Sequence, residues 1–124
     1  MEIYKGLLVE DEKVIQRVHG FYLKSLGYNF DLAENAESTL DYLKRQKYDF
    51  ILLDNGLPDI QGVDLCKMIR QTEKKKNAKP VPIIFLTTHH IIRHECFEAG
   101  CNDFMIKPVS QESLKNLIEY WIRF

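Results

Sequence analysis

The chain has 124 residues, of which 45% are hydrophobic and 28% charged, as in one globular domain with a buried core. Its formal net charge of −1 provides no general attraction to nucleic acid, so direct nucleic-acid binding is not expected. No apolar run approaches the roughly 18 residues that span a bilayer, and residues 1–6 lack the pattern of a secretory signal. We therefore expect a single domain over residues 1–124, located in the cytoplasm and without membrane contact.

Short apolar runs alternate with helical patterns along the chain. The runs expected to be buried strands are 7–9, 30–33, 50–53, 83–86 and 104–106. Helical spacing predicts helices over 14–26, over 36 to about 46, from 62 onward, over 89–99 and after Ser110, which should cap the last one. Gly27 and Gly100 should end the first and fourth helices. The charged stretch 73–80 is expected to be a solvated loop. This alternation predicts an α/β fold with a doubly wound parallel sheet.

Polar side chains follow the expected strands at the points where they end. Glu10 and Asp11 follow 7–9, Asp54 follows 50–53, Thr87 follows 83–86 and Lys107 follows 104–106. Because the carboxyl ends of parallel strands meet at one edge of a sheet, where open sheets bind ligands, these side chains are expected to converge.

Three carboxylates that lie together repel one another, so one must be protonated or a cation must lie among them. Hard oxygen ligands suit Mg²⁺ or Mn²⁺, and the backbone carbonyl of Gly56 would complete the set. Lys107 and the Thr87 hydroxyl, with such a metal, fit a dianionic phosphoryl group. An aspartate can itself be the nucleophile that forms an aspartyl-phosphate, and Asp54 is the best-placed acid for that role.

Several short motifs occur in one order across essentially the whole chain: Glu10-Asp11, Leu52-Leu53-Asp54, Leu57-Pro58 with Gly62, Thr87 and Lys107-Pro108. Each piece alone is common, but the ordered set resembles the receiver domain of two-component response regulators and hybrid sensor histidine kinases. The resemblance implies a flavodoxin-like (βα)5 fold, with a five-stranded parallel sheet in the strand order 2-1-3-4-5.

The resemblance also implies how the site works. Asp54 would accept a phosphoryl group from the phosphohistidine of a histidine kinase or a histidine phosphotransfer domain. Mg²⁺ would be held by Asp11, Asp54 and the Gly56 carbonyl, and Glu10 would act through a metal-bound water. The protein would then be a phosphoacceptor regulator in a phosphorelay that assists its own phosphorylation and dephosphorylation, and not an enzyme.

Two further residues would transmit the signal. Thr87 would follow the phosphoryl group, and Phe104 matches the family's switch aromatic. The face made by the fourth helix, the fifth strand and the fifth helix would carry the signal to partners, and a weak homodimer through that face is a further expectation.

The chain departs from the commonest family pattern at several positions. Glu10 stands where aspartate is more frequent, and Thr88 stands beside the phosphoryl position where alanine or glycine is usual. The bulk of Thr88 should therefore slow phosphorylation by small molecules. Asn55-Gly56 and His89 occupy positions that tune the lifetime of the phosphoryl group in the family.

Other functions remain as alternatives. One is a degenerate receiver-like interaction module that takes no phosphoryl group. A second is an aspartate-nucleophile phosphatase of the dehalogenase type, which needs an acid where Gly56 stands. A third is a flavin-binding electron carrier. In that case the acidic residues 10–12 would repel the phosphate of the flavin.

The cysteines are expected to pack in the core as small apolar residues. The sharper alternative is a zinc site built from His90 and His94 with Cys96 or Cys101.

The output of the protein is open. The stretches 27–28 and 82–84 resemble receivers at the C-terminus of hybrid sensor kinases, and no effector domain follows the last helix. The chain is therefore expected to be either a stand-alone receiver or a piece of a longer protein.

Overall fold

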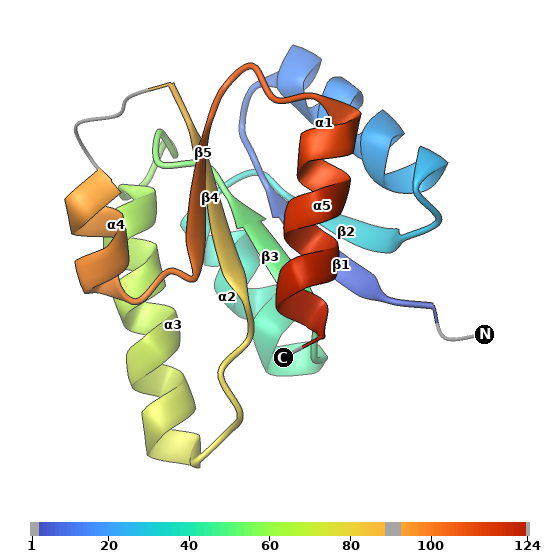
Figure 1. Ribbon diagram of the computed structural model, residues 1–124. Coiled ribbons are helices and arrows are strands. Elements are labelled where there is room, and N and C mark those ends of the chain that lie inside the picture. The colour runs from blue at the N-terminus through green and yellow to red at the C-terminus, as the bar shows by residue number, and fades with distance from the viewer. Residues whose placement is uncertain (1–2, 89–92, 124) are drawn as a thin grey trace.

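The computed structural model describes residues 3–88 and 93–123, in which strands and helices alternate (Figure 1). The strands are β1 (Lys5–Val9), β2 (Asn29–Ala33), β3 (Phe50–Leu53), β4 (Ile83–Thr87) and β5 (Asp103–Ile106). The helices are α1 (Lys13–Ser25), α2 (Ala36–Arg45), α3 (Gly62–Lys76), α4 (Arg93–Ala99) and α5 (Gln111–Ile122). Within the described ranges, none of the helices has both the length and the apolar character needed to cross a membrane.

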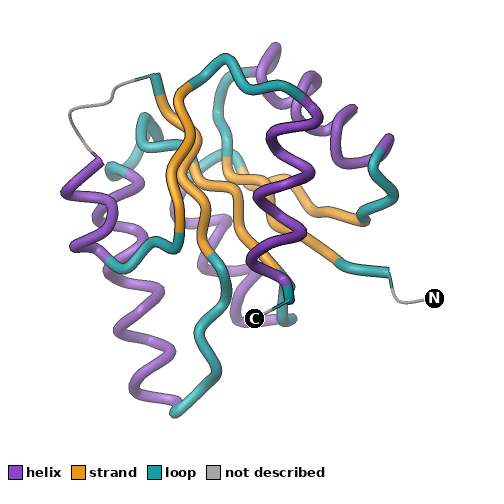
Figure 2. Tube along the Cα trace, in the orientation of Figure 1, coloured by secondary structure: helices purple, strands orange, loops and turns teal. Residues whose placement is uncertain are grey.

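All five strands are parallel and lie in the order β2-β1-β3-β4-β5, which confirms the predicted fold (Figure 2). The inner strand β3 is apolar throughout because helices cover both faces of the sheet, and none of its four residues is solvent-exposed. The pairing register places Val9 opposite Leu53 and Thr87 opposite Ile106. The residues that come directly after these positions therefore meet at the same edge of the sheet.

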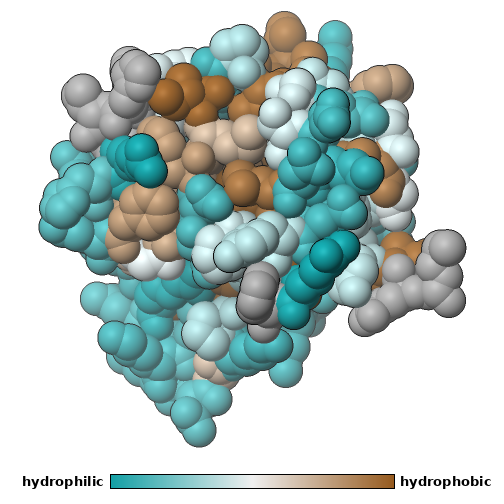
Figure 3. Space-filling model, viewed as in Figure 1, coloured by the Kyte–Doolittle hydropathy of each residue, from teal (hydrophilic) through white to brown (hydrophobic). Residues whose placement is uncertain are grey.

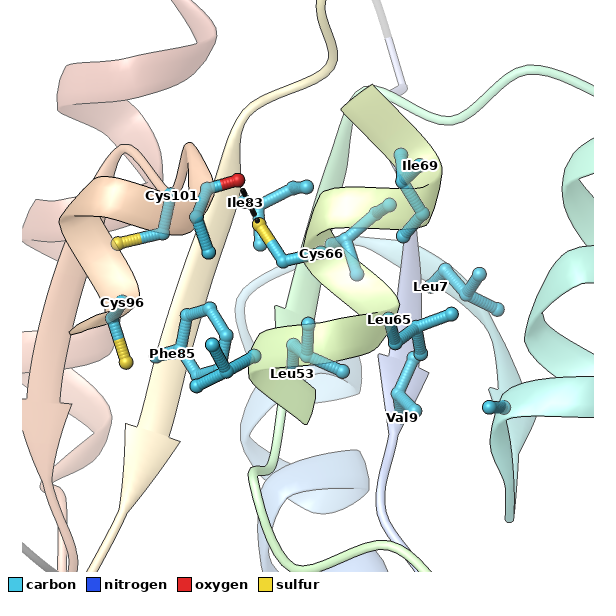
Figure 4. Close-up of a cluster of buried hydrophobic side chains, with 14 of the residues drawn as sticks. Leu7, Val9, Leu53, Leu65, Cys66, Ile69, Ile83, Phe85, Cys96 and Cys101 are labelled. Carbon is cyan, nitrogen blue, oxygen red and sulfur yellow. Dashed lines mark hydrogen bonds between the residues drawn. The ribbon is translucent and has the colours of Figure 1, made fainter. Parts of the chain in front are cut away.

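Alternate residues of the strands build two separate cores. One core contains Leu7, Ile51 and Phe85, and α2, α3 and α4 cover it (Figure 4). The other contains Leu8 and Ile84 and lies beneath α1 and α5. Since side chains alternate between the two faces of a strand, one register fixes both cores at once.

The periodicity correctly predicted the first helix, but it did not show which face of that helix is buried. Val14, Val18 and Phe21 are 62%, 39% and 66% exposed, whereas Gln16 and His19 are buried. The buried face of α1 is therefore partly polar, and an apolar stripe lies on its outer surface. Apolar content alone could not distinguish the two faces because the polar side chain of Gln16 has a partner in the fold.

The prediction that 73–80 is a loop was wrong in its first half, because α3 continues to Lys76. Lysine and glutamate are good helix formers, and cations near a helix C-terminus interact favourably with the helix dipole. Glu73 joins the helix to its surroundings: one oxygen pairs with Arg70 at 2.8 Å and the other accepts the Val81 N–H at 2.8 Å. The helix ends at Asn77, whose φ of 52° is left-handed.

The predicted helix ends are otherwise confirmed. Gly27 and Gly100 have φ values of +87° and +108° after α1 and α4, a region that glycine enters without strain. Ser110 caps α5, since its hydroxyl oxygen accepts the Ser113 N–H at 3.1 Å. The fourth helix is described from Arg93 onward, so the predicted part over 89–92 lies outside the described residues.

Large apolar side chains also remain on a second outer surface. Phe97 of α4 and Ile106 of β5 are 41% and 38% exposed. Figure 3 shows hydrophobic side chains gathered between α4 and α5, over β5. This surface is the face that would carry the signal according to the resemblance to receiver domains.

A buried histidine lies on the inner side of α1. His19 is 3% exposed, and its Nδ1 has no hydrogen-bond partner among the described residues. Burial, reinforced by the charge of Lys107, lowers the pKa of His19 to about 4. The folded protein therefore keeps this imidazole neutral at pH values where an exposed histidine takes up a proton.

We expect His19 to make the folded state less stable in mild acid. The pKa of His19 is lower in the folded than in the unfolded chain, so its contribution to the free energy of unfolding is complete above pH 6.5. This contribution is lost as the pH falls from 6.5 toward 4, and the total loss is about 3 kcal/mol. Urea unfolding of a His19→Gln variant should show a flatter pH dependence in that window. Parallel curves for wild type and His19→Gln would contradict the prediction.

Candidate functional site

The carboxyl edge of the sheet brings the predicted site residues together. The Asp54 N–H donates to the Val9 carbonyl at 3.1 Å, so the β1–β3 pairing extends one residue beyond the strands. On the other side, the Lys107 N–H donates to the Thr87 carbonyl at 2.7 Å. The backbone ladder itself therefore sets the positions from which Glu10, Asp54 and Lys107 project.

Lys107 is the cation that these acids share. Its Nζ lies 2.7 Å from Glu10 Oε1 and 3.0 Å from Asp54 Oδ1. The side chains of Lys107, Glu10 and Asp54 are only 9%, 3% and 13% exposed, respectively. Solvent therefore screens this pair of salt bridges far less than an ion pair on the surface.

Burial and charge oppose each other at this site. Burial and the nearby charge of Asp54 raise the pKa of Glu10, although Lys107 acts in the opposite direction. Burial alone would lower the pKa of Lys107, but its hydrogen bonds and charge interactions with Glu10 and Asp54 outweigh burial and raise it. Lys107 thus stays protonated, and the site retains a fixed positive charge.

Glu10 is held in place on both sides. Its Oε2 accepts the Glu12 N–H at 3.2 Å, and its backbone carbonyl accepts a hydrogen bond of 2.7 Å from Nε2 of the buried Gln16. Both carboxylate oxygens of Glu10 therefore have partners within the protein. The sequence alone does not predict this role of Gln16, because a polar side chain on an amphipathic helix would ordinarily face solvent.

Glu10, Asp11 and Asp54 form the one cluster of potential metal ligands among residues 3–88 and 93–123. One oxygen atom from each residue lies within 4.8 Å of the others. Asp11 is exposed and Asp54 is partly exposed, while Glu10 is buried. Clustered carboxylate oxygens that open to solvent suit a hard divalent cation of the Mg²⁺ type.

Two glycines shape the loop after β3. A Cβ atom at Gly62 would lie 2.5 Å from the Asp54 carbonyl oxygen, so no side chain fits there and α3 begins directly against the loop. A Cβ atom at Gly56 would lie 3.5 Å from Asp54 Oδ2. Glycine at position 56 thus leaves the space beside this carboxylate oxygen without a side chain.

Two loop side chains anchor this segment to neighbouring helices. Asn55 Oδ1 accepts the Val63 N–H of α3 at 3.0 Å. The carboxylate of Asp59 accepts the Ala36 and Glu37 N–H groups at the start of α2, at 2.9 and 3.0 Å. Although its modest burial acts the other way, these backbone hydrogen bonds lower the pKa of Asp59. Sequence reasoning missed both roles because the bonded groups are 8 to 23 residues apart.

The two predicted switch residues lie on the adjacent strands β4 and β5. Thr87 is the last residue of β4 and is 2% exposed. Phe104 lies opposite Phe85 in the β4–β5 register, is partly buried and packs against the core beneath α2, α3 and α4. Thr88 comes directly after Thr87 and is exposed.

The three cysteines are buried and free, which confirms that they pack in the core. Burial raises the pKa of the Cys66 thiol to about 11 and those of Cys96 and Cys101 to about 12. His94 pairs with Glu98 on the surface of α4, and no metal-ligand cluster of described residues contains it. The alternative of a zinc site therefore has no support from these residues; His89 and His90 lie outside the described part of the chain.

Comparison with known proteins supports one family. A family model for the response regulator receiver domain matches residues 7–119. The chain is similar to the receiver domain of a sensor histidine kinase from Pseudomonas aeruginosa PAO1, whose structure has a magnesium ion coordinated in the active site cleft. The identity is 35% and the TM-score 0.88, over 99% of this chain and 100% of that one.

Two further relatives come from eukaryotes. The receiver domain of the Saccharomyces cerevisiae response regulator Ssk1, solved with the histidine phosphotransfer protein Ypd1, is 28% identical, with a TM-score of 0.89 over 96% of this chain and 88% of that one. Hybrid signal transduction histidine kinase M of Dictyostelium discoideum is 32% identical over 91% of this chain but only 5% of its own length. The chain thus corresponds to a small part of that relative.

The family match covers the five strands almost completely and includes the whole site, and the fold and the clustered acids agree with it. The chain therefore belongs to the response regulator receiver domain family, the phosphoacceptor module of two-component signalling.

Proposed function

We propose that Asp54 accepts the phosphoryl group in this receiver. The observation that carries the proposal is the position of Lys107 between Glu10 and Asp54 at the carboxyl edge of the sheet. Lys107 bonds one oxygen of each acid, and the other oxygen of Glu10 accepts the Glu12 N–H. Asp54 Oδ2 instead has no hydrogen-bond partner among the described residues, and it lies 3.5 Å from the position that a Cβ atom at Gly56 would take. Asp54 is thus the acid whose carboxylate is both oriented by a cation and open on its second oxygen.

The proposed transfer is a displacement at phosphorus. Asp54 Oδ2 attacks the phosphorus atom of a phosphohistidine, the new P–O bond forms, and the P–N bond breaks. The imidazole leaves with the electron pair of that bond and takes up a proton. Lys107 supports the step because its ammonium group compensates negative charge on the phosphoryl oxygens, which is the main requirement of phosphoryl transfer.

The acids fit a divalent metal, and we propose Mg²⁺, or Mn²⁺, as the cofactor. Asp11, Asp54 and the Gly56 carbonyl would hold it, while the buried Glu10, with both oxygens already engaged, would act through water. When bound, the metal would neutralise charge on the carboxylates and on the phosphoryl oxygens. The magnesium in the Pseudomonas aeruginosa relative supports this assignment.

The switch is proposed to use Thr87 and Phe104. Thr87 ends the strand beside Lys107, so its hydroxyl can follow a phosphoryl oxygen, and Phe104 on the adjacent strand would turn inward as Thr87 moves. The exposed apolar surface between α4 and α5 would then present a changed face to partners or to a second copy of the chain.

Rival functions fit the site less well. A dehalogenase-type phosphatase needs a second acid two residues after its nucleophile, where this chain has Gly56. The acidic residues 10–12 would repel the phosphate of a flavin. The presence of Asp54, Thr87 and Lys107 together argues against a module that takes no phosphoryl group. We therefore propose a regulator that assists its own phosphorylation and dephosphorylation, rather than an enzyme acting on a separate substrate.

The donor and the context are proposals as well. A histidine kinase or a histidine phosphotransfer domain would supply the phosphoryl group; the Ypd1 complex of the yeast relative supports the latter. Residues 1–124 would act as one receiver unit, either alone or as part of a hybrid histidine kinase. We place it in the cytoplasm, where such donors act and where three reduced cysteines are expected.

Phosphotransfer profiling tests the proposed function. A panel of phosphorylated histidine kinases and phosphotransfer domains should label the wild-type chain in the presence of Mg²⁺, and intact-mass analysis should detect one phosphoryl group. Asp54→Asn should abolish labelling, and a metal chelator should prevent it. Asp41→Asn removes the charge of an exposed acid on α2, away from the site, and should keep labelling; equal labelling of Asp54→Asn and wild type would refute the role of Asp54.

We expect Thr88 to hinder small phosphodonors. Its side chain is exposed directly after Thr87, so replacing it by alanine should widen the approach to Asp54. Labelling of Thr88→Ala by acetyl phosphate should be about 3-fold faster than that of wild type, or ~0.7 kcal/mol in the barrier. Thr88→Ser, which keeps a hydroxyl but removes a methyl group, should fall between them. An unchanged rate for Thr88→Ala would contradict the prediction.

The two exposed apolar surfaces should have separate roles. The exposed apolar stripe of α1, formed by Val14, Val18 and Phe21, lies next to the loop that carries Asp11, so we propose that it contacts the phosphodonor protein. The surface at Phe97 would instead mediate weak self-association. Phe21→Asp should slow transfer from a phosphotransfer domain about tenfold, roughly the cost of losing one buried aromatic contact, while leaving acetyl phosphate labelling intact.

Phe97→Asp should instead abolish the weak dimer in sedimentation velocity and leave phosphotransfer unchanged. Each variant is the control for the other. If both variants impair the same process, or if neither has an effect, the division of the two surfaces is wrong.

A further inference from the structure

A broad groove lies at the opposite edge of the sheet from Asp54. It has a volume of about 920 Å³ and runs beneath the amino-terminal ends of the central strands, from the end of α2 past the end of α3 to the end of α5. Figure 1 shows the lower part of α3 and the loop that follows it extending beyond the sheet and below the last turn of α5. This volume lies in the range of sites that hold ligands or anchoring side chains.

The floor of the groove is apolar. Leu43 from α2, Ile69 from α3, Val81 before β4, and Trp121 and Ile122 from α5 contribute to it. Met68 also lines the groove and is 40% exposed. A hollow with large apolar side chains on its walls is suited to receive an aliphatic or aromatic side chain.

The rim of the groove is strongly basic. Its lining contains five cationic residues and two acids, a formal balance of +3 in a chain whose net charge is −1. Four of the cations, Lys44, Lys47, Lys76 and Lys79, form no ion pair with any residue of the described ranges.

The two acids in the lining are already engaged. Asp49 accepts the Lys5 N–H at 2.7 Å. Glu73 binds Arg70 and the Val81 N–H. Within the described ranges, the rim lysines thus have no carboxylate of their own chain to neutralise them.

The helix dipoles explain the positions of some of these lysines. Lys44 and Lys76 lie in the last turns of α2 and α3, where cations are favoured. Lys47 and Lys79 come after the ends of those helices, and a dipole does not explain the apolar floor between them. The combination of unpaired cations and an apolar floor indicates complementarity to a ligand that is both acidic and apolar.

We propose that this groove binds an acidic peptide segment of a partner protein, which inserts an aliphatic or aromatic side chain between α2, α3 and α5 while its carboxylates face the lysines at the rim. The strands are four or five residues long, so the groove lies roughly 15 Å from the carboxyl edge. The segment can therefore bind while a phosphodonor occupies Asp54. The proposal does not depend on phosphorylation of the site.

The single tryptophan of the chain gives a direct readout. Trp121 lines the groove, so the emission of the intact protein reports occupancy when the probe contains no tryptophan. Three synthetic peptides of about twelve residues serve as probes: one alternates glutamate with leucine and phenylalanine, one alternates glutamate with glycine, and one alternates lysine with leucine and phenylalanine. Only the first should change the Trp121 emission in a saturable manner.

Matched variants locate the binding surface. The double substitution Lys76→Glu and Lys79→Glu reverses two rim charges and should weaken binding of the acidic-apolar peptide roughly tenfold, as expected for several exposed charge contacts. The control, Lys74→Glu with Lys75→Glu, makes the same change of net charge at two α3 residues outside the groove and should leave binding unchanged. All four lysines are exposed, so both variants should fold.

Three results would overturn the proposal. Equal weakening by the two double variants would indicate a general charge effect. Equal binding of the glutamate–glycine peptide would show that the apolar floor takes no part. Amide shifts of the acidic-apolar complex that cluster at 10, 11 and 54, rather than at 44–47 and 76–82, would place the peptide at the opposite edge.

Discussion

The site depends on the pairing of the Lys107 ammonium group with two carboxylates. It lies within 3.0 Å of both Glu10 and Asp54, in a place where solvent screens little of its charge. Without it, two carboxylates would face each other with Asp11 nearby, and repulsion would raise the pKa of at least one of them. A buried cation of this kind is costly unless it is paired, so the acids and the lysine require one another. The Asp54 carboxylate is thereby oriented by Lys107.

The sheet supplies the precision of this arrangement. Lys107 reaches the acids because the β4–β5 and β1–β3 ladders each extend one residue past their strands. A shift of one residue in either register would turn a site residue to the other face and would also exchange the two cores. Two hydrogen-bonding side chains then fix the loop after β3: Asn55 binds the start of α3, and Asp59 binds the start of α2. Fold stability and site geometry therefore rest on the same contacts.

Local sequence patterns were sufficient to predict the sheet and the residues at its carboxyl edge. The strands, their parallel direction and the meeting of Glu10, Asp11, Asp54 and Lys107 could be anticipated because apolar runs, together with the polar residues directly after them, specify a sheet edge. The order of the strands followed only from the resemblance to receiver domains. The roles of Gln16 and Asp59 could not be anticipated, since each depends on a backbone group outside its own local pattern. The lysines after residue 73 were assigned wrongly because charge alone does not distinguish a solvated helix from a solvated turn.

Chemical identification of the phosphorylated side chain tests the central claim most directly. Borohydride reduces an aspartyl-phosphate to homoserine, and peptide mass analysis then locates the modified residue. We predict homoserine at position 54 after phosphotransfer with Mg²⁺, with Glu10 and Asp11 unmodified. Reduction at Glu10 or Asp11, or the absence of any reduced acid in a protein that carries a phosphoryl group, would contradict the account.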